Sequence, residues 1–289
     1  MYGYDVGFVQ HESGTRLTRR DDMSSLTILV PILHPTGNAP MTRLRAALIP
    51  LLLLSAARLA SAGPQSEDGF VSLFDGKDLS KWIVPEGDGG HWKIVAGVID
   101  YDARSEAKGD KNLVTRETYG DFVIKLDWRL KETPYTNPNI AYVLPDGTHA
   151  RGVDGKPLKL SLPDSDSGLF LRDMKGKSQV NMWCWPIGSG EVYGYRMDAK
   201  MPAKVRAGVT PKTQADKPVG EWNSFEITLK KDRLTVVLNG VKVIDDAELP
   251  GIPETGPIAL QHHGGYKDGK YTGPPSLVQF RNIRIKKLD

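Results

Sequence analysis

Residues 121–130 carry the pattern that most constrains the fold of this chain. Apolar side chains occupy every second position of the segment, at Phe122, Ile124, Leu126, Trp128 and Leu130. Successive side chains of a strand point to opposite faces, whereas a helix repeats roughly every 3.6 residues. The segment therefore predicts a long strand with one buried face, which needs a second layer of structure to cover it.

Shorter strand signals continue along the chain, with turn residues between them. Asn239-Gly240 separates two apolar runs and is the strongest hairpin signal. Ala96-Gly97 separates an earlier pair in the same way. Further strands are expected at 92–95, 98–101, 169–171, 224–229, 257–261 and 278–285. No segment shows a helical period with caps, so the sequence predicts an all-β sandwich or barrel.

Two long insertions interrupt the predicted strands. Residues 132–167 are rich in Pro, Asn, Asp and Gly, and residues 184–220 contain several prolines and lysines. Both are expected to be loops, and loops of such length are usually functional or disordered. No linker divides 63–289, which we interpret as one domain with its core at 69–287.

The N-terminal part has the three parts of a secretory signal peptide. Residues 41–45 are basic, 46–57 are largely apolar, and Ala60-Ser61-Ala62 offers small residues to a signal peptidase. An internal buried helix is the alternative. We predict a signal peptide at 41–62 and an exported protein, periplasmic or secreted, with no membrane anchor after cleavage. Residues 1–40 are interpreted as a gene-model extension or a disordered leader.

The composition of the predicted mature chain limits its partners. Residues 63–289 contain 32 Lys and Arg against 31 Asp and Glu, so no basic excess favours a nucleic-acid partner. The single cysteine, Cys184, excludes an intrachain disulfide and lies between Trp183 and Trp185, which favours packing over catalysis. Phosphate-loop, zinc-finger and dinucleotide motifs are absent from the sequence.

Several motifs in order resemble the 3-keto-disaccharide hydrolase family over about 69–287. They are FDGKDLSKW at 74–82, WKIVAGVI at 92–99, DSGLFLR at 166–172, the hairpin within 221–241, GPIALQHHG at 256–264 and FRNIRI at 280–285. The resemblance implies a two-sheet antiparallel jelly-roll sandwich of the concanavalin or lectin type, with two long loop insertions.

The resemblance also implies cleavage of glycosides that are already oxidised at C3. A 3-keto group makes the C2 proton acidic, so a modest base can remove it, the C1 substituent leaves, and water adds back. Such a site needs a base, an electrophile for the enolate oxygen and, in some cases, a divalent metal ion. The implied partner is a carbohydrate.

Four residues of the DSGLFLR and GPIALQHHG motifs are candidates for this chemistry. His263 is expected to be a base or metal ligand, or else to orient a loop, and Gln261 projects on the same side if the strand runs that far. Its neighbour His262 is expected to be structural. Arg172 could hold an oxyanion or sugar hydroxyls, with a cross-sheet salt bridge as the alternative. Asp166 could be a metal ligand or base, although Asp in a turn commonly bonds its own backbone.

The chain departs from the family pattern after DSGLFLR. Many members carry Glu-x-Gln there, whereas this chain has Gln179 and Asn181, which can bind hydroxyls but supply no carboxylate. Glu191, in the following stretch, could replace the missing base. Tyr193 and Tyr195 are substrate-binding candidates, because aromatic rings suit sugar stacking; we expect at least one of them on the rim.

Three functions remain open from the sequence. The first is a 3-keto-glycoside hydrolase, and the second is a non-catalytic, lectin-like glycan-binding module on the same fold. An ordinary retaining glycosidase is weaker, because no strand shows a suitably spaced pair of carboxylates. The enzyme hypothesis predicts that Arg172, Gln179, Asn181 and His263 gather around one sugar.

Overall fold

The structure is a computed structural model that describes residues 69–174 and 177–289. The predicted leader at 1–40 and signal peptide at 41–62 lie outside the described residues. Neither helix among the described residues is long and apolar enough to span a membrane.

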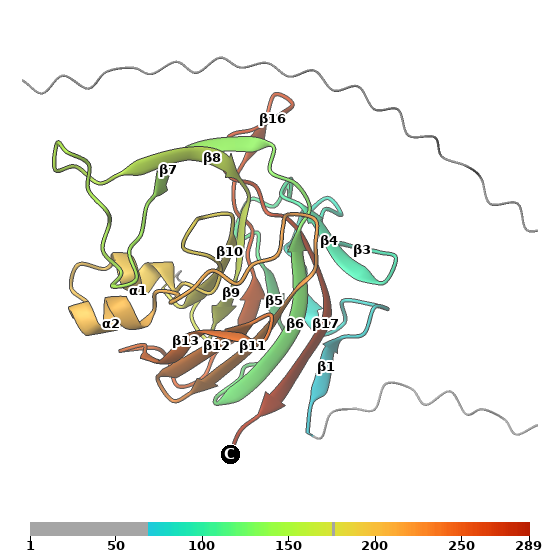
Figure 1. The fold of residues 1–289 in the computed structure, drawn as a ribbon. Coiled ribbons are helices and arrows are strands. Elements are labelled where there is room, and N and C mark those ends of the chain that lie inside the picture. The colour runs from blue at the N-terminus through green and yellow to red at the C-terminus, as the bar shows by residue number, and fades with distance from the viewer. Residues whose placement is uncertain (1–68, 175–176) are drawn as a thin grey trace, which may run out of the picture. The chain divides into compact units, whose positions relative to one another are not determined.

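Two antiparallel sheets form the domain (Figure 1). The larger has the strand order β13-β12-β11-β6-β17-β4-β3, with β1 paired to β17, and the smaller has the order β10-β9-β14-β5-β2. The eight strands of the larger sheet are β1 (Val71–Phe74), β3 (Lys93–Val95), β4 (Val98–Asp102), β6 (Phe122–Leu130), β11 (Asn223–Lys230), β12 (Arg233–Leu238), β13 (Val241–Glu248) and β17 (Leu277–Lys287). The five strands of the smaller sheet are β2 (Trp82–Ile83), β5 (Leu113–Thr115), β9 (Asp166–Leu171), β10 (Gln179–Trp183) and β14 (Ile258–Leu260). The all-β jelly-roll prediction is confirmed.

The alternating segment behaves as the sequence predicts. It forms β6, which lies between β11 and β17, and its apolar side chains are buried while the intervening ones are partly exposed. Phe122 and Ile124 are fully buried in the core between the sheets. Asn239 and Gly240 both have positive φ, at 53° and 82°, as a tight hairpin of this handedness requires.

The insertions carry secondary structure that the sequence analysis missed. Within 132–167, β7 (Tyr135–Ala141) and β8 (Lys159–Asp164) form a hairpin. Within 184–220, α1 (Tyr193–Met197) and α2 (Ala203–Gly208) are short helices without side-chain caps. A further small hairpin, β15 (Tyr266–Lys267) with β16 (Lys270–Tyr271), follows His263.

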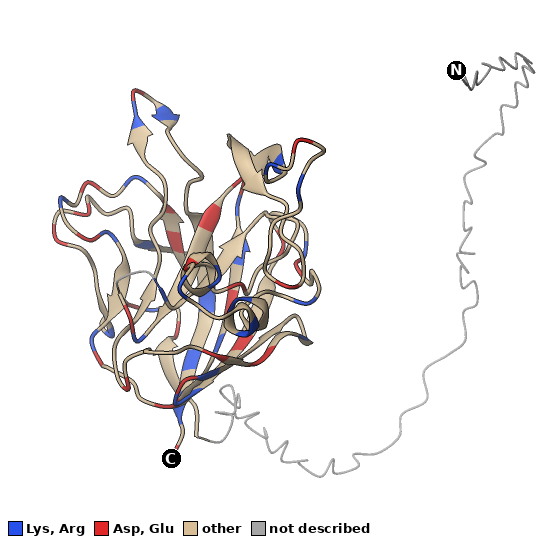
Figure 2. Ribbon diagram, turned by 90° about the vertical axis from the view of Figure 1, so that its left-hand side faces the viewer, with Lys and Arg blue, Asp and Glu red and all other residues tan. Residues whose placement is uncertain are grey.

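Acidic and basic residues are mixed over the described domain. Figure 2 shows blue and red segments interspersed along the strands and loops, with neither sign confined to one side. This distribution agrees with the near-equal numbers of Lys plus Arg and Asp plus Glu in residues 63–289.

Candidate functional site

The outer face of the smaller sheet collects polar side chains from three adjacent strands, β10, β9 and β14. Asn181 of β10 lies opposite Gly168 of β9, and Trp183 lies opposite Asp166. Directly paired residues share a face, and Gln179 joins this face by alternation. A Cβ atom at Gly168 would collide with the Gln179 side chain, which would then have to move. The glycine thus lets the Gln179 side chain lie flat across the sheet.

The strand β14 brings Gln261 beside this group. The backbone N–H of Gln261 donates to the carbonyl of Gly168 at 2.9 Å, extending the pairing of β14 with β9. The Gln179 amide donates through Nε2 to Oε1 of Gln261 and to the carbonyl of Ser167, the latter at 3.3 Å. Among the described residues, Nε2 of Gln261 and the Asn181 side chain have no hydrogen-bond partner, so both can bind a ligand.

Asp166 and His263 meet at the end of the same face. Nε2 of His263 lies 3.9 Å from Oδ2 of Asp166. Nδ1 of His263 lies 2.7 Å from the carbonyl of Pro274, which can only accept, so Nδ1 carries a proton. The backbone N–H of His263 donates to Oγ of Ser276 at 2.6 Å. These two contacts fix the imidazole with Nε2 directed at Asp166.

Burial makes the Asp166 carboxyl a weaker acid than usual and raises its pKa to about 7. The interaction with His263 opposes this shift, and the charge of Asp164 adds to it. Oδ1 of Asp166 is buried without a hydrogen-bond donor among the described residues. The side chain is nevertheless 16% exposed, so it is accessible from the outer face. A carboxyl of this kind is half ionised near neutrality, as a general base requires.

Asp164 is a functional candidate that the sequence analysis missed. Its Oδ2 accepts from Nδ2 of Asn137 at 2.8 Å and from Nε1 of Trp185 at 3.2 Å. Burial raises its pKa as well. The spacing Asp-Ser-Asp was the available signal, because residues two apart on an extended chain share a face. The first insertion supplies Asn137, so its hairpin helps to hold this carboxylate.

Aromatic side chains border the Asp166 end of the face. The rings of Trp183 and Trp185 stack 4.2 Å apart, and Tyr193 meets both edge-on. Trp183 is buried, whereas Tyr193 is 39% exposed. Of the two tyrosines expected near the rim, Tyr193 is the exposed one. Tyr195 is in the core, where its hydroxyl donates to the carbonyl of Pro250 at 3.2 Å, so its predicted place at the substrate is wrong.

Comparison with known proteins decides the family. The sequence profile described as "3-keto-alpha-glucoside-1,2-lyase-like domain" matches residues 69–286. The chain belongs to this family. Membership indicates a glycoside hydrolase-like or carbohydrate-binding function. No curated protein matches the chain.

Solved structures with a similar fold include carbohydrate-active proteins. One provisionally assigned glycosyl hydrolase of Parabacteroides distasonis has 20% identity and a TM-score of 0.49, and covers 76% of this chain and 84% of its own. A second from the same organism has 21% identity, a TM-score of 0.46, and coverages of 76% and 95%. The carbohydrate-binding module CBM66 of Bacillus subtilis has 14% identity, a TM-score of 0.36, and coverages of 72% and 96%.

Arg172 does not join the site of this 3-keto-glucoside lyase-like domain. It follows the last residue of β9, at the opposite end from Asp166, and is buried. Its guanidinium donates to the carbonyls of Gly120 and Lys231, each at 2.7 Å, and pairs with Asp121 at 2.9 Å. No end of the planar fork is left for a sugar, so the predicted catalytic placement is wrong and the salt-bridge alternative holds.

Glu191 faces the protein rather than a substrate. Its side chain is fully buried and forms an ion pair with Nε of Arg196 on α1. Arg196 also lies 2.8 Å from Nε2 of His149, which comes from the first insertion. The Glu191 carbonyl accepts from the N–H of Asn181 at 2.9 Å, so the segment continues the sheet. An occluded, paired carboxylate is poorly placed to replace the missing family base.

His262 has the structural position that the sequence predicts. Its Nδ1 lies 2.6 Å from the hydroxyl of Tyr101, and its backbone N–H donates to Oδ1 of Asn112 at 2.7 Å. Burial lowers the pKa of His262 to about 4, with a further contribution from Lys111. It is therefore neutral at physiological pH, and its contacts with Tyr101 and Asn112 hold it in place.

The predicted metal site is incomplete in the described residues. Asp166 and His263 are two suitable ligands, but within 69–174 and 177–289 no group of three or more His, Cys, Asp or Glu is arranged to hold a metal. A zinc site takes at least three protein ligands. Asp166 and His263 alone do not complete such a site.

Proposed function

We propose that the outer face of the smaller sheet cleaves 3-keto-glycosides by elimination followed by hydration. The observation that carries the proposal is the Asp166–His263 pair, in which a largely buried carboxyl with a pKa of about 7 faces an imidazole nitrogen. Family membership supports the choice of substrate class, because the matching profile is described as lyase-like on 3-keto-glucosides.

Asp166 is the base in this mechanism. The ketone at C3 stabilises the carbanion at C2 as an enolate, so a carboxylate near neutral pKa suffices to remove the C2 proton. A carboxylate with the ordinary pKa of 3.8 would be a weaker base. Burial therefore supplies the basicity, and the exposed part of the side chain supplies the access.

His263 completes the proton balance. In the reacting form Asp166 is ionised and Nε2 of His263 carries the proton that the leaving group will take. Asp166 takes the C2 proton, the enolate collapses to a C1–C2 double bond, and the C1–O bond breaks as His263 protonates the departing oxygen. Water then adds at C1 with its proton going to His263, and Asp166 returns a proton to C2.

Neighbouring groups bind and polarise the sugar. Nε2 of Gln261 and the Asn181 amide are donors without partners among the described residues, so they can hydrogen-bond the enolate oxygen and ring hydroxyls. The exposed edge of Tyr193 offers an apolar surface for a sugar ring. Gln179 acts by orienting Gln261, with which it shares a hydrogen bond.

The direct test is turnover of 4-nitrophenyl 3-keto-glucoside by the full chain, with unoxidised 4-nitrophenyl glucoside as the substrate control. We expect nitrophenolate release only from the oxidised sugar. Asp166→Asn should lower kcat/KM by about 10²- to 10⁴-fold. Asp245→Asn, at an exposed position of β13, is the matched control and should leave the rate unchanged. Equal release from both sugars, or full activity in Asp166→Asn, would refute the proposal.

A lectin-like binding function is the second candidate. It is favoured by the absence of a carboxylate at Gln179 and Asn181 and by the occlusion of Glu191. Binding of the 3-keto sugar by calorimetry without any turnover would select this function over the enzyme.

A further inference from the structure

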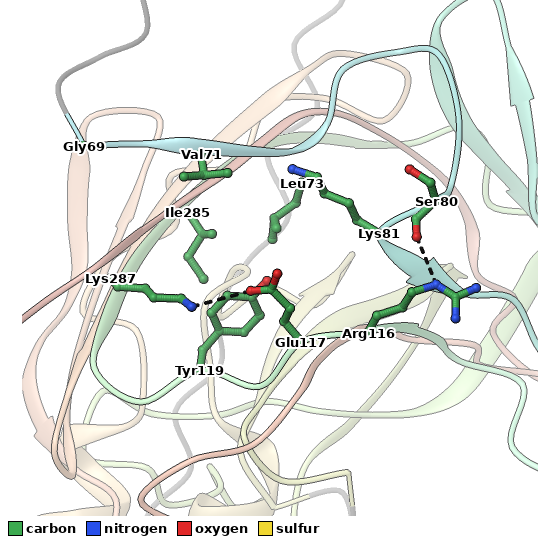
Figure 3. A pocket seen from close by; sticks show the side chains of 10 residues that line it. All are labelled: Gly69, Val71, Leu73, Ser80, Lys81, Arg116, Glu117, Tyr119, Ile285 and Lys287. Carbon is green, nitrogen blue, oxygen red and sulfur yellow. Dashed lines mark hydrogen bonds and ion pairs between the residues drawn. The ribbon is translucent and has the colours of Figure 1, made fainter.

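A cavity lies far from the Asp166–His263 site. Its volume is about 470 Å³, within the range of small-molecule sites. It opens where the C-terminal end of β17 passes β1 and the chain that follows β5 (Figure 3). The other end of β17 adjoins Ser276, which holds His263, so the length of the strand separates the two by roughly 30 Å. The cavity is lined by Gly69, Val71, Leu73, Ser80, Lys81, Arg116, Glu117, Tyr119, Ile285 and Lys287.

One wall of this cavity is apolar. Leu73 of β1 and Ile285 of β17 are buried behind it, while Val71 is 58% exposed at its mouth. Figure 3 shows these three side chains together, facing Tyr119 and Glu117 across the space. Such a wall favours a ligand with a hydrocarbon body over a fully hydrated ion.

The opposite wall offers hydrogen-bond donors. The Tyr119 residue is only 3% exposed, it lines the cavity, and its hydroxyl has no hydrogen-bond partner among the described residues. Burial, with the nearby charge of Glu117, raises the pKa of Tyr119 to about 12, so the hydroxyl keeps its proton and remains a donor. Tyr119 therefore presents both its ring and a protonated hydroxyl to the cavity.

Cationic side chains outnumber acidic ones around the cavity. Arg116 donates through Nε to the carbonyl of Ser80 at 2.9 Å, which anchors the side chain and leaves its terminal nitrogens without a partner among the described residues. Lys81 lies beside it and donates to the carbonyl of Ser72. Lys287 is partly neutralised by Glu117, 3.5 Å away. The remaining field attracts an anion.

We infer that this cavity binds a small organic anion that carries one carboxylate on an apolar body. The carboxylate accepts from the planar fork of Arg116, and the apolar body packs on Leu73, Ile285 and the ring of Tyr119. The inference is independent of the proposed catalysis, because no lining residue belongs to the outer face of the smaller sheet.

The test is calorimetric titration of the full chain with 4-phenylbutyrate and with its neutral isostere, 4-phenylbutanamide. The carboxylate should bind with one-to-one stoichiometry and at least about tenfold more tightly than the amide. Arg116→Gln should weaken carboxylate binding about tenfold. Arg151→Gln is the matched control, because Arg151 is an exposed arginine with one main-chain bond elsewhere, and it should bind normally.

Three results would overturn the inference. They are no binding of the carboxylate, equal affinity for the amide, and unchanged affinity in Arg116→Gln. Asp166→Asn should bind 4-phenylbutyrate as the unmodified protein does, so failure of this inference and failure of the proposed catalysis are distinguishable.

Discussion

Strand β9 has an acidic residue at its start and a basic residue just past its end, and the two differ in how completely they are hydrogen-bonded. At its start, Asp166 has one oxygen buried without a donor and the other 3.9 Å from His263. Just past its end, Arg172 is paired with Asp121 and donates to two carbonyls. Both residues belong to the same short motif, yet only the first has capacity to bind or react.

The difference shows how to separate function from structure when charges are buried. A buried charge whose hydrogen bonds are complete has no capacity for a ligand, and its removal damages the fold. A buried carboxyl left partly unpaired costs stability and acquires a shifted pKa, which folding alone does not require. Asp166 is a partly unpaired carboxyl of this kind, whereas Arg172 is a fully hydrogen-bonded charge, and substitutions at the two positions should differ accordingly.

The largest expected effect on stability comes from Arg172→Met. Removing the guanidinium leaves Asp121 and two carbonyls without their donor, so the free energy of unfolding should fall by about 3–5 kcal/mol. Urea denaturation of the purified variant measures this. Molecules that remain folded should retain the catalytic rate of the unmodified protein, and a selective loss of kcat with normal stability would place Arg172 in the active site after all.

The pH dependence should separate Asp166 from ordinary carboxyls. Because its carboxyl must be ionised to act as base, kcat/KM should rise about tenfold per unit as pH increases toward about 7. The folded state also keeps a proton that the unfolded chain releases nearer 3.8, so the free energy of unfolding should decrease as pH rises from about 4 to 7.

Asp166→Asn provides the control for both pH profiles. It should lack the decrease in unfolding free energy over that window, since the ionisable group is gone. Stability profiles of the two proteins that run parallel across the window would show that the pKa of Asp166 is not raised.

Gly168→Ala tests the amide pair in the middle of the face. The added Cβ would collide with the Gln179 side chain, so Gln261 would lose its fixed orientation. We expect kcat/KM to fall about tenfold, equivalent to one lost hydrogen bond to the developing charge. Gly109→Ala, where a Cβ meets nothing within 4 Å, is the control. Identical kinetics in both variants would remove Gln179 and Gln261 from the site.

The smallest effect is expected at the aromatic rim. Tyr193→Ala should raise KM by about fivefold through loss of a stacking surface. Tyr195→Phe removes one hydroxyl that bonds a carbonyl in the core, so it should lower stability by about 1 kcal/mol and leave KM unchanged. A raised KM in Tyr195→Phe alone would reverse these assignments.

The sequence predicted the sheets better than the insertions. Alternation at 121–130 and the Asn239-Gly240 turn identify strands and a hairpin because both patterns follow from local backbone geometry. The helices α1 and α2 are five and six residues long and lack side-chain caps, so their helical pattern is too short to recognise. Contacts with the rest of the domain hold them in place.

The candidate site was only partly predictable for the same reason. Period-two alternation groups Asn181 with Gln179 on one face of β10. It does not extend from Gln261 to His263, because β14 ends at Leu260. It fails for Arg172, because the strand ends there and the residue takes a φ of +59°, which redirects its side chain. Neither the pairing of Glu191 with Arg196 nor the support of Asp164 by Asn137 is visible locally, since each joins distant segments.

The most direct test of the central claim is the deuterium isotope effect at C2. Nitrophenolate release from 4-nitrophenyl 3-keto-glucoside would be compared with release from the same compound deuterated at C2, under kcat/KM conditions. The account predicts a normal primary isotope effect with the unmodified protein, because Asp166 removes that hydrogen in a rate-contributing step, and loss of the reaction in Asp166→Asn. Cleavage without an isotope effect that continues in Asp166→Asn would contradict it.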